Sequence, residues 1–295
     1  MRVMQVPAPF EYERATSVEH AIDLLERLGG SARLVAGGHS ILPMMKLRLV
    51  NVEYLIDIND LHAELGYVRV EPNRIRIGAM TRHRELLESA ELRRHFPIFH
   101  DAERVIADPL VRNRGTFGGN VANGDPANDG PAIVIALGAE LVARGPQGER
   151  TIAANRFYKD LFVTALAPDE ILTEIRIPQP PPRSGSAYRK LKRKTGDYAA
   201  AAAAVQLTLD ARGAVQRACI ALTNAGPTPV EAVQGSRFLE GKTPDEKSIA
   251  EAARLAAAAA APSADRRGSV EYKREMARVL TARALKAALE RAGRS

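Results

Sequence analysis

The sequence predicts an α+β fold built in two parts. Residues 16–30 carry apolar side chains at helical spacing, whereas residues 74–79 alternate with the period of two that is typical of a half-buried strand. The predicted strands and helices do not alternate regularly, so a parallel α/β sheet is not expected. Prolines at 178 and 180–182 form an extended stretch that cannot continue a sheet. We therefore expect one domain in residues 1–177 and a smaller one in residues 178–295.

The first elements follow from capping and periodicity. Thr16-Ser-Val-Glu19 has the spacing of a capping box, in which the glutamate side chain reaches back to the amide of the capping residue. The helix that begins there is expected to end at Gly29. Strands are then predicted at 33–36, 51–58 and 74–79.

The region that follows predicts helices and then a sheet. Residues 81–107 are expected to form two helices separated by Pro97, because proline ends the helix before it and tolerates the first turn of the next. Another helix is predicted from Pro131 to Leu137. Strands are expected at 140–144, 150–152 and 171–177, around a Gly-Pro-Gln-Gly hairpin at 145–148.

Beyond the prolines, propensity and pattern disagree. The alanines at 199–204 favour a helix by propensity, yet Val205, Leu207 and Leu209 alternate and run into a turn at 210–213. Residues 215–223 resume the apolar pattern after that turn, so we predict a β-hairpin. Helices near 229–239, 245–261 and 270–292 complete a small α+β unit.

Composition and charge limit the class of protein. The chain is 45% hydrophobic and 26% charged, without an apolar run long enough to span a membrane and without the apolar core of a signal peptide at its start. A cytoplasmic location is therefore expected. A net charge of +7 suggests nucleic acid as a partner, but aromatic residues make up only 5% and tryptophan is absent. We expect an acidic protein partner or an anionic cofactor instead, and no nucleic acid.

Cysteine and histidine usage argue against bound metals. Cys219 is the only cysteine, which excludes an internal disulfide and a cysteine-ligated iron–sulfur cluster in this chain. The six histidines lack the spacing of zinc ligands. Any electrons that pass through the protein must be carried by an organic cofactor.

Two glycine-rich stretches are the strongest functional signal. Residues 34–40 follow an apolar run, and residues 113–130 hold five glycines with small polar neighbours. Gly115, Gly118 and Gly119 are expected to offer positive φ, so that successive backbone N–H groups form a concave nest for a pyrophosphate. Neither stretch fits the dinucleotide fingerprint or the P-loop. The residues alone therefore predict only that something phosphorylated is bound.

The two stretches resemble the flavin loops of a known family. Ala36-Gly-Gly-His-Ser40 and Thr116-Phe-Gly-Gly-Asn120 are similar to those of the FAD-binding subunits of molybdenum hydroxylases, the family of the xanthine dehydrogenase and carbon monoxide dehydrogenase medium chains. The resemblance covers essentially the whole chain, and residues 36–46 are most similar to the carbon monoxide dehydrogenase branch. It implies a two-subdomain FAD-binding domain of the PCMH type, followed by a small α+β C-terminal domain with an antiparallel sheet and helices.

The resemblance also implies roles for individual residues. Asp129 would accept sugar hydroxyls, although it suits a helix cap equally well. Leu172 would contact the flavin through its backbone. Lys190 would lie at the flavin edge and stabilise reduced flavin, although alone it fits a solvated charge in a basic run equally well. The implied FAD-binding residues are Ala36, Gly37, Gly38, His39, Ser40, Ile41, Thr116, Gly118, Gly119, Asn120, Asn123, Asp129, Leu172, Lys190 and Tyr198, and no catalytic residue is implied.

Some positions depart from the family pattern. Ile106 stands where xanthine dehydrogenases place an aromatic residue beside the flavin, so Tyr198 is the candidate substitute. The cluster-binding insertion of some relatives is missing. A histidine at the position of His39 is joined covalently to flavin in more distant oxidases but not in the medium chains, so non-covalent binding is expected. His39 would then act as a neutral imidazole that hydrogen bonds to phosphate or to a loop carbonyl.

The function implied is electron transfer. The chain would take electrons from a small iron–sulfur subunit, store two on FAD and pass them to a quinone-type acceptor. A large subunit would hold the molybdenum cofactor, in a dimer of heterotrimers that either stays in the cytoplasm or attaches peripherally to the inner face of the membrane. Two alternatives remain: a free-standing flavin oxidase or reductase of the same fold, such as a relative of UDP-N-acetylenolpyruvoylglucosamine reductase, and a basic non-enzymatic binding module.

Overall fold

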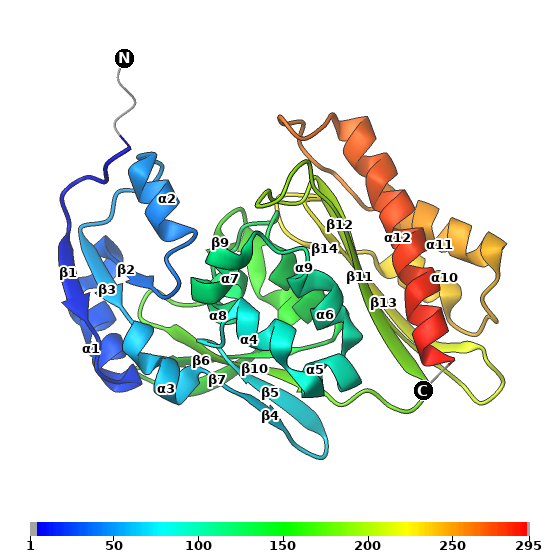
Figure 1. The fold of residues 1–295 in the computed structure, drawn as a ribbon, viewed down its shortest axis with the longest axis horizontal. Helices are drawn as coiled ribbons and strands as arrows, with labels where there is room; N and C mark the ends of the chain where they lie inside the picture. Colours follow the sequence, from blue (N-terminus) through cyan, green and yellow to red (C-terminus); the bar gives the residue numbers. More distant parts are fainter. Residues whose placement is uncertain (1–4, 294–295) are drawn as a thin grey trace.

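The computed structural model describes residues 5–293, and the chain runs through three successive units in Figure 1. The first is a parallel sheet of order β1-β3-β2, covered by α1 and followed by the short α2. The bounds of its elements are β1 Glu11–Arg14, α1 Val18–Leu28, β2 Ala32–Val35, α2 Ile41–Lys46, β3 Tyr54–Asp57 and α3 His62–Leu65.

Helix α1 forms for the predicted reason, with its cap displaced by one residue. Ser17, rather than Thr16, is the N-cap, and its hydroxyl accepts a hydrogen bond from the His20 amide at 3.1 Å. The expected capping box from Thr16 is therefore wrong. The helix ends at Gly29, which has a positive φ of 60°, as the sequence predicted.

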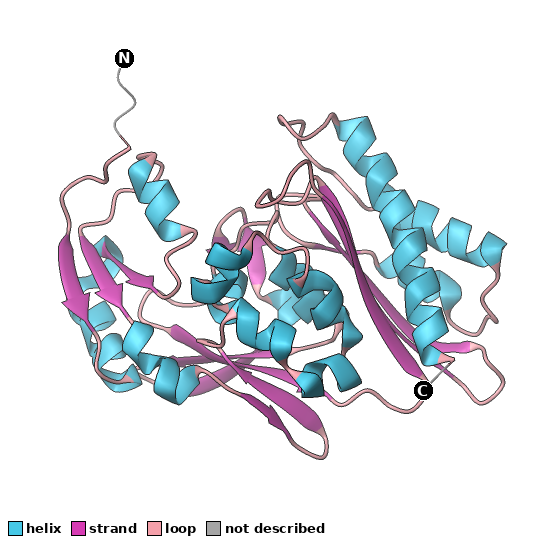
Figure 2. Ribbon diagram, in the orientation of Figure 1, coloured by secondary structure: helices cyan, strands magenta, loops and turns pink. Residues whose placement is uncertain are grey.

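The second unit is an antiparallel sheet of order β4-β5-β10-β6-β7 with a group of short helices on one face, as Figure 2 shows. Its bounds are β4 Val68–Val70, β5 Arg74–Gly78, α4 His83–Glu88, α5 Ala90–His95, α6 Pro97–Glu103, α7 Pro109–Arg114, α8 Phe117–Ala122, α9 Asp129–Ala136, β6 Glu140–Gly145, β7 Gly148–Ala153, β8 Tyr158–Asp160, β9 Val163–Thr164 and β10 Ile171–Pro178. The predicted strands β5, β6, β7 and β10 are confirmed.

The region before α7 contains one more helix break than expected. Pro97 opens α6 as predicted, but Ser89 also ends α4 and caps α5, accepting a hydrogen bond from the Leu92 amide at 3.2 Å. The prediction of two helices between 81 and 107 was therefore wrong. A serine that ends one helix and starts the next is difficult to distinguish from a helix-interior serine by pattern alone.

The third unit is an antiparallel sheet of order β11-β12-β13-β14 with three helices on its outer face (Figure 1). Its bounds are β11 Ser184–Leu191, β12 Ala201–Leu209, β13 Val215–Thr223, β14 Val230–Glu231, α10 Val233–Leu239, α11 Glu246–Ala258 and α12 Val270–Ala292. The predicted hairpin and the three predicted helices are confirmed. The boundary at residue 178 stays a prediction.

Strand β12 explains why its alanines do not form a helix. One face packs against α12 and the other against α9 of the second unit. Ala201–Ala204 are buried on both faces, and such small side chains let two helices approach one sheet closely. At Gly185 on β11 a Cβ would overlap the Ala288 carbonyl of α12. Tertiary packing therefore overrides the helical propensity of the alanine run.

One carboxylate joins the second and third units. Asp101 on α6 accepts hydrogen bonds from Arg291 near the end of α12, at 2.8 and 2.9 Å, and from Arg189 on β11 at 2.9 Å. The Tyr188 amide donates to the same carboxylate at 3.2 Å. Burial alone would raise the pKa of Asp101, but the hydrogen bond and charge of Arg291 outweigh it, and the pKa lies below its ordinary value. Within residues 5–293, no helix is long and apolar enough to cross a bilayer.

Candidate cofactor site

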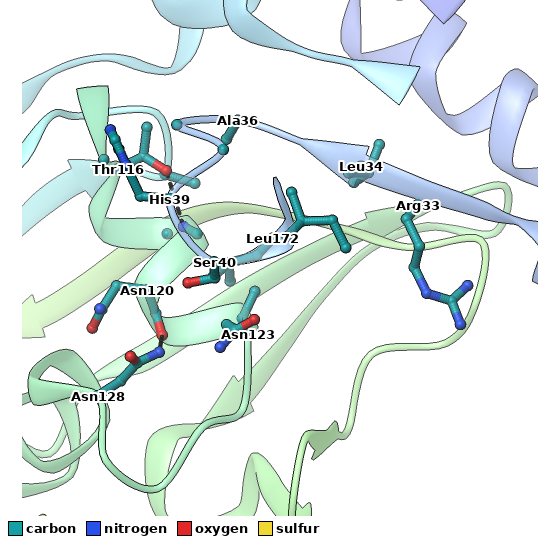
Figure 3. A pocket seen from close by; sticks show the side chains of 18 of the residues that line it. Arg33, Leu34, Ala36, His39, Ser40, Thr116, Asn120, Asn123, Asn128 and Leu172 are labelled. Atoms are coloured by element: carbon teal, nitrogen blue, oxygen red, sulfur yellow. Dashed lines mark hydrogen bonds between the residues drawn. The ribbon is translucent and has the colours of Figure 1, made fainter. Parts of the chain in front are cut away.

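A cavity of about 740 Å³ lies where the three units meet. Its volume falls in the range of small-molecule and cofactor sites. All fifteen residues that the resemblance implied line its wall, including Leu172 from the second unit and Lys190 and Tyr198 from beyond the proline stretch. Figure 3 shows the loop with Ala36, His39 and Ser40 lying beside the helix that carries Asn120 and Asn123. The fold thus brings these residues together, while their contact with a cofactor stays a prediction.

The first glycine stretch has the properties of an anion site. The backbone N–H groups of residues 37–41 donate no hydrogen bond to any residue between 5 and 293. Gly38 has φ of 76°, a conformation that side chains rarely adopt. Unpaired, convergent amides at the wall of a cavity are suited to phosphate oxygens.

The second stretch is a helix, which corrects the expected nest. Thr116 is the N-cap of α8, and its hydroxyl accepts from the Gly119 amide at 3.2 Å. The amides of Phe117 and Gly118 donate to carbonyls of the segment after β5, both at 2.9 Å. Gly115, Gly118 and Gly119 do not have positive φ. This stretch therefore does not form the expected nest of free amides for a pyrophosphate.

The glycines of both stretches serve close packing instead. A Cβ on Gly37 would lie 2.5 Å from the Arg114 carbonyl oxygen and 2.6 Å from the Gly115 Cα. A Cβ on Gly118 would lie 2.6 Å from the Ala79 carbonyl oxygen. Backbone segments that touch so closely leave no space for a side chain. The Gly37 contact brings the first loop against the end of α7, and the Gly118 contact brings α8 against the segment after β5.

Asparagine side chains supply polar groups on the α8 side. The Asn120 side-chain oxygen accepts from the Gly130 amide at 2.9 Å, and its backbone carbonyl accepts from the Asn128 side chain at 2.9 Å. Asn123 Nδ2 is buried without a hydrogen-bond partner in the described chain. A buried donor left unpaired costs stability, so a ligand oxygen at this point would satisfy it.

The Asp129 carboxylate is held by two residues of β11. Its Oδ2 lies 2.8 Å from Lys190 Nζ, and its Oδ1 accepts from the Tyr188 hydroxyl at 2.5 Å. The helix-cap alternative for Asp129 is wrong, because Asn128 is the N-cap of α9. The solvated alternative for Lys190 is also wrong, because its side chain is 1% exposed. Burial, followed by the Asp129 charge, raises the pKa of Tyr188 well above its usual value.

The remaining predicted residues lie around this charge pair. Leu172 sits next to a register shift between β10 and β6. Ile106 lines the cavity as an apolar wall, and Tyr198 is 37% exposed at the edge, with the Arg267 guanidinium 5.6 Å from its ring. Burial, opposed by Asp108 and reinforced by Arg114, lowers the pKa of His39. A neutral imidazole, as the sequence suggested for His39, is consistent with that shift.

Sequence reasoning missed other cavity residues. His83 lines the wall from the start of α4, and its Nδ1 lies 3.0 Å from the buried Glu103 carboxylate. Phe162 lines it from the β8–β9 turn with φ of 57°. A lone histidine beside arginines and a phenylalanine in an apolar turn carry no motif, so no sequence signal marks either one.

The donors and acceptors fit a flavin nucleotide better than a metal. The wall offers free amides at one point, a buried unpaired amide side chain, and a lysine–aspartate pair. In the described range 5–293, no three histidine, cysteine or acidic side chains are grouped closely enough to hold a metal ion.

Comparison with known proteins identifies the family to which the chain belongs. A family model for the FAD-binding domain in molybdopterin dehydrogenase matches residues 8–180, and one for the carbon monoxide dehydrogenase flavoprotein C-terminal domain matches residues 186–288. The chain belongs to the FAD-binding flavoprotein family of molybdopterin dehydrogenases, an oxidoreductase family whose cofactor is FAD.

Comparison with individual relatives shows which members of this family the chain resembles strongly. The chain is 45% identical to the carbon monoxide dehydrogenase medium chain of Afipia carboxidovorans, over 97% of this chain and 99% of the relative. It is similar to a solved carbon monoxide dehydrogenase from Hydrogenophaga pseudoflava, with a TM-score of 0.94 and 45% identity over 97% of this chain and 99% of that chain. It is 37% identical to the 6-hydroxypseudooxynicotine dehydrogenase complex subunit alpha of Paenarthrobacter nicotinovorans, over 97% of this chain and 96% of the relative. The chain is therefore similar to flavoprotein subunits of the medium-chain type along almost its whole length.

Proposed function

We propose that this chain is the electron-transfer subunit of an aerobic carbon monoxide dehydrogenase. It takes electrons from an iron–sulfur subunit and passes them to a quinone-type acceptor. The observation that carries the proposal is the 45% identity to a carbon monoxide dehydrogenase medium chain along almost the full length of both chains. The gathering of all fifteen expected residues around one cavity supports it.

The residues divide the work of holding FAD. The free amides of residues 37–41 bind the diphosphate, and Asn123 satisfies its buried amide on the cofactor. Asp129 keeps acceptor capacity for a sugar hydroxyl, since each carboxylate oxygen has more than one lone pair. Lys190 holds a positive charge at the ring edge, and Tyr198 covers the ring in place of the missing aromatic residue at 106. FAD supplies the redox chemistry, accepting two electrons and releasing them singly or as a pair.

The larger assembly follows from the same proposal. Residues 1–177 carry most of the FAD site, and residues 178–295 dock partner subunits. A small subunit delivers electrons through iron–sulfur clusters, and a large subunit holds the molybdenum cofactor, in a dimer of heterotrimers. The assembly works in the cytoplasm or at the inner face of the membrane, where a quinone collects the electrons.

A second substrate class has a specific observation in its favour. A relative at 37% identity is part of a 6-hydroxypseudooxynicotine dehydrogenase complex, so a heterocycle is the competing substrate. Family membership favours a subunit over the free-standing flavoenzyme, and FAD binding by the family argues against a plain binding module.

The test compares the complex with the isolated chain. We expect the purified chain to show a flavin absorption spectrum that carbon monoxide leaves unchanged. We expect the complex with its two partner subunits to bleach the same band anaerobically under carbon monoxide and to reduce a quinone. Bleaching by a heterocycle but not by carbon monoxide would reassign the substrate, and bleaching of the isolated chain would refute the subunit function.

A further inference from the structure

A buried ionisable pair stands behind the cavity wall and has no part in the roles above. The Nδ1 atom of His83 lies 3.0 Å from Oε2 of Glu103, and the two side chains are 4% and 0% exposed. A carboxyl group without solvent is costly unless a partner compensates for the lost hydration. Burial raises the pKa of Glu103, while the charge and hydrogen bond of His83 oppose that shift. The two groups therefore act as one unit.

Only the histidine of this pair reaches the cavity. His83, at the first position of α4, lines the wall, whereas Glu103, at the end of α6, is fully enclosed behind it. Glu103 engages Nδ1 with both carboxylate oxygens, at 3.2 and 3.0 Å. The other ring nitrogen, Nε2, has no hydrogen-bond partner among residues 5–293. A histidine held through one nitrogen presents the other in a fixed direction.

His83 lies under the point where the two glycine stretches touch. Its backbone N–H donates to the Gly115 carbonyl at 3.1 Å, and a Cβ on Gly115 would lie 3.0 Å from its ring. Gly115 packs in turn against Gly37, where the run of free amides begins. The charge of His83 also contributes to lowering the pKa of His39 in that loop. The imidazole is therefore close to the part of the cavity suited to an anion.

We propose that His83 is a further FAD-binding residue, donating a hydrogen bond from Nε2 to a diphosphate oxygen, and that Glu103 is its positioning residue. The inference rests on the proposed binding of FAD in this cavity. When one proton is shared between Nδ1 and the Glu103 carboxyl, Nε2 keeps its own hydrogen wherever the shared proton lies. Burial raises the pKa of Glu103, so its carboxyl group supplies the shared proton. Once Glu103 has lost that proton at high pH, the one remaining hydrogen faces the carboxylate from Nδ1, and Nε2 becomes an acceptor that repels phosphate.

Other charged groups lie around the pair of His83 and Glu103 and affect its protonation. The charge of Arg112 on α7 lowers the pKa of Glu103 and favours its ionised form, whereas the charge of Asp129 on α9 raises that pKa. The titratable and charged groups facing the pair are His39, Arg112, Asp129 and Tyr188. Since substitution of the charged neighbours would change several contacts at once, the test varies the two members of the pair, adds His39→Gln as a control for the other cavity imidazole, and compares ligands with and without phosphate.

The first experiment titrates the flavin-free full-length chain with FAD and with riboflavin, following flavin fluorescence. His83→Gln is expected to weaken FAD binding about tenfold and to leave riboflavin binding unchanged, because riboflavin has no phosphate. His100→Gln is the matched control, since His100 lies on α6, outside the cavity, and has a buried ring nitrogen of its own without a partner. Equal losses for both ligands, or no loss of FAD affinity, would overturn the proposal. Failure of the wild-type chain to bind FAD would instead overturn the proposed function.

The second experiment measures the pH profile of FAD affinity. We expect affinity to fall as pH rises from 6 to 9 in wild type and to stay flat in His83→Gln. Glu103→Gln keeps the volume and removes the titrating carboxyl group, and its amide can donate an N–H to Nδ1 at any pH, so the fall in affinity should be lost. The series is repeated with His39→Gln to remove the other cavity imidazole. An unshifted profile in Glu103→Gln would refute the positioning role, and this variant decides the question if His83→Gln does not fold.

Discussion

The contact between Gly37 and the Arg114–Gly115 backbone allows a precise perturbation of the cofactor site. In Gly37→Ala the new Cβ would lie 2.5 Å from the Arg114 carbonyl oxygen, and real Cβ contacts essentially never fall below 3.0 Å. The two backbones must therefore separate by about 0.5 Å, the difference between those distances. Neither side is a flexible side chain, so the strain cannot be relieved by a rotamer change.

The size of the effect follows from the cost of overpacking. Inserting a methyl group into a tight contact costs about 1–3 kcal/mol. Since about 1.4 kcal/mol is a factor of ten, the loss of FAD affinity should be roughly 5- to 150-fold if the strain is concentrated in the loop that binds the diphosphate. From the sequence alone, Gly37→Val and Gly118→Val are expected to lose FAD because a β-branched side chain occupies the ligand's space and disfavours positive φ. The structure gives steric overlap as the reason at both positions, and alanine is already enough to test it.

The assay is FAD affinity by fluorescence titration together with the melting temperature of the flavin-free chain. Gly293→Ala is the matched control, because its nearest contact would be an ordinary 3.6 Å and it lies far from the cavity at the end of α12. We expect the Gly37 variant to lose affinity with little change in flavin-free melting temperature, and the control to change neither. Wild-type FAD affinity in Gly37→Ala would refute the argument that loop apposition builds the site.

Further predictions concern single side chains. Asp129→Ala should weaken FAD binding by about 1–3 kcal/mol and lower the melting temperature, because buried Lys190 loses its counter-charge; titration and melting curves check both, and unchanged FAD affinity would remove Asp129 from the site. Asp101→Asn should destabilise the chain by about 1–3 kcal/mol at neutral pH. The pKa of Asp101 is depressed in the folded chain, so this stabilisation is present above the unfolded pKa and is lost as pH falls through the folded pKa. The melting temperatures of wild type and variant should therefore converge in acid. A difference that stays constant with pH would contradict the stabilising role of the ion pairs that Asp101 forms with Arg189 and Arg291. Acid precipitation should leave FAD in the supernatant, and yellow protein in the pellet would mean a covalent link to His39.

The hydrophobic pattern of the sequence predicted helices and strands correctly where interactions between residues near in sequence determine the structure. The alternation in residues 74–79 became β5 with Ile75 and Ile77 buried, as a half-buried strand requires. The hairpin of β12 and β13 was also predicted, because alternation from Val205 onward outweighed the propensity of the alanines before it. The small size of those alanines makes sense only when α9 and α12 are seen on the two faces of the strand.

The glycine-rich stretch after residue 113 shows where such reasoning ends. Its glycines suggested a nest, but carbonyls of Ala79 and Thr81 bind the first amides, and the Thr116 hydroxyl caps the next. Those carbonyls come from a strand end more than 30 residues earlier, so the local sequence cannot report them. The same holds for the pair of His83 with Glu103 and for Asp101 with Arg291, whose positions differ by 190 residues. Ion pairs between residues so far apart in the sequence produce no periodic pattern from which they could be predicted.

Strand β11 has a consequence for the order in which the protein is made. It belongs to the C-terminal sheet, yet Tyr188 and Lys190 on it hold the carboxylate of Asp129 across the cavity. A nascent chain folds its N-terminal part first, and at that stage the buried carboxylate has no cation and the cavity lacks one wall. If FAD binds in this cavity as proposed, we expect its capture to follow the emergence of β11 from the ribosome. A gene fragment cut at the proline stretch would encode the loops of the site without the residues that close it.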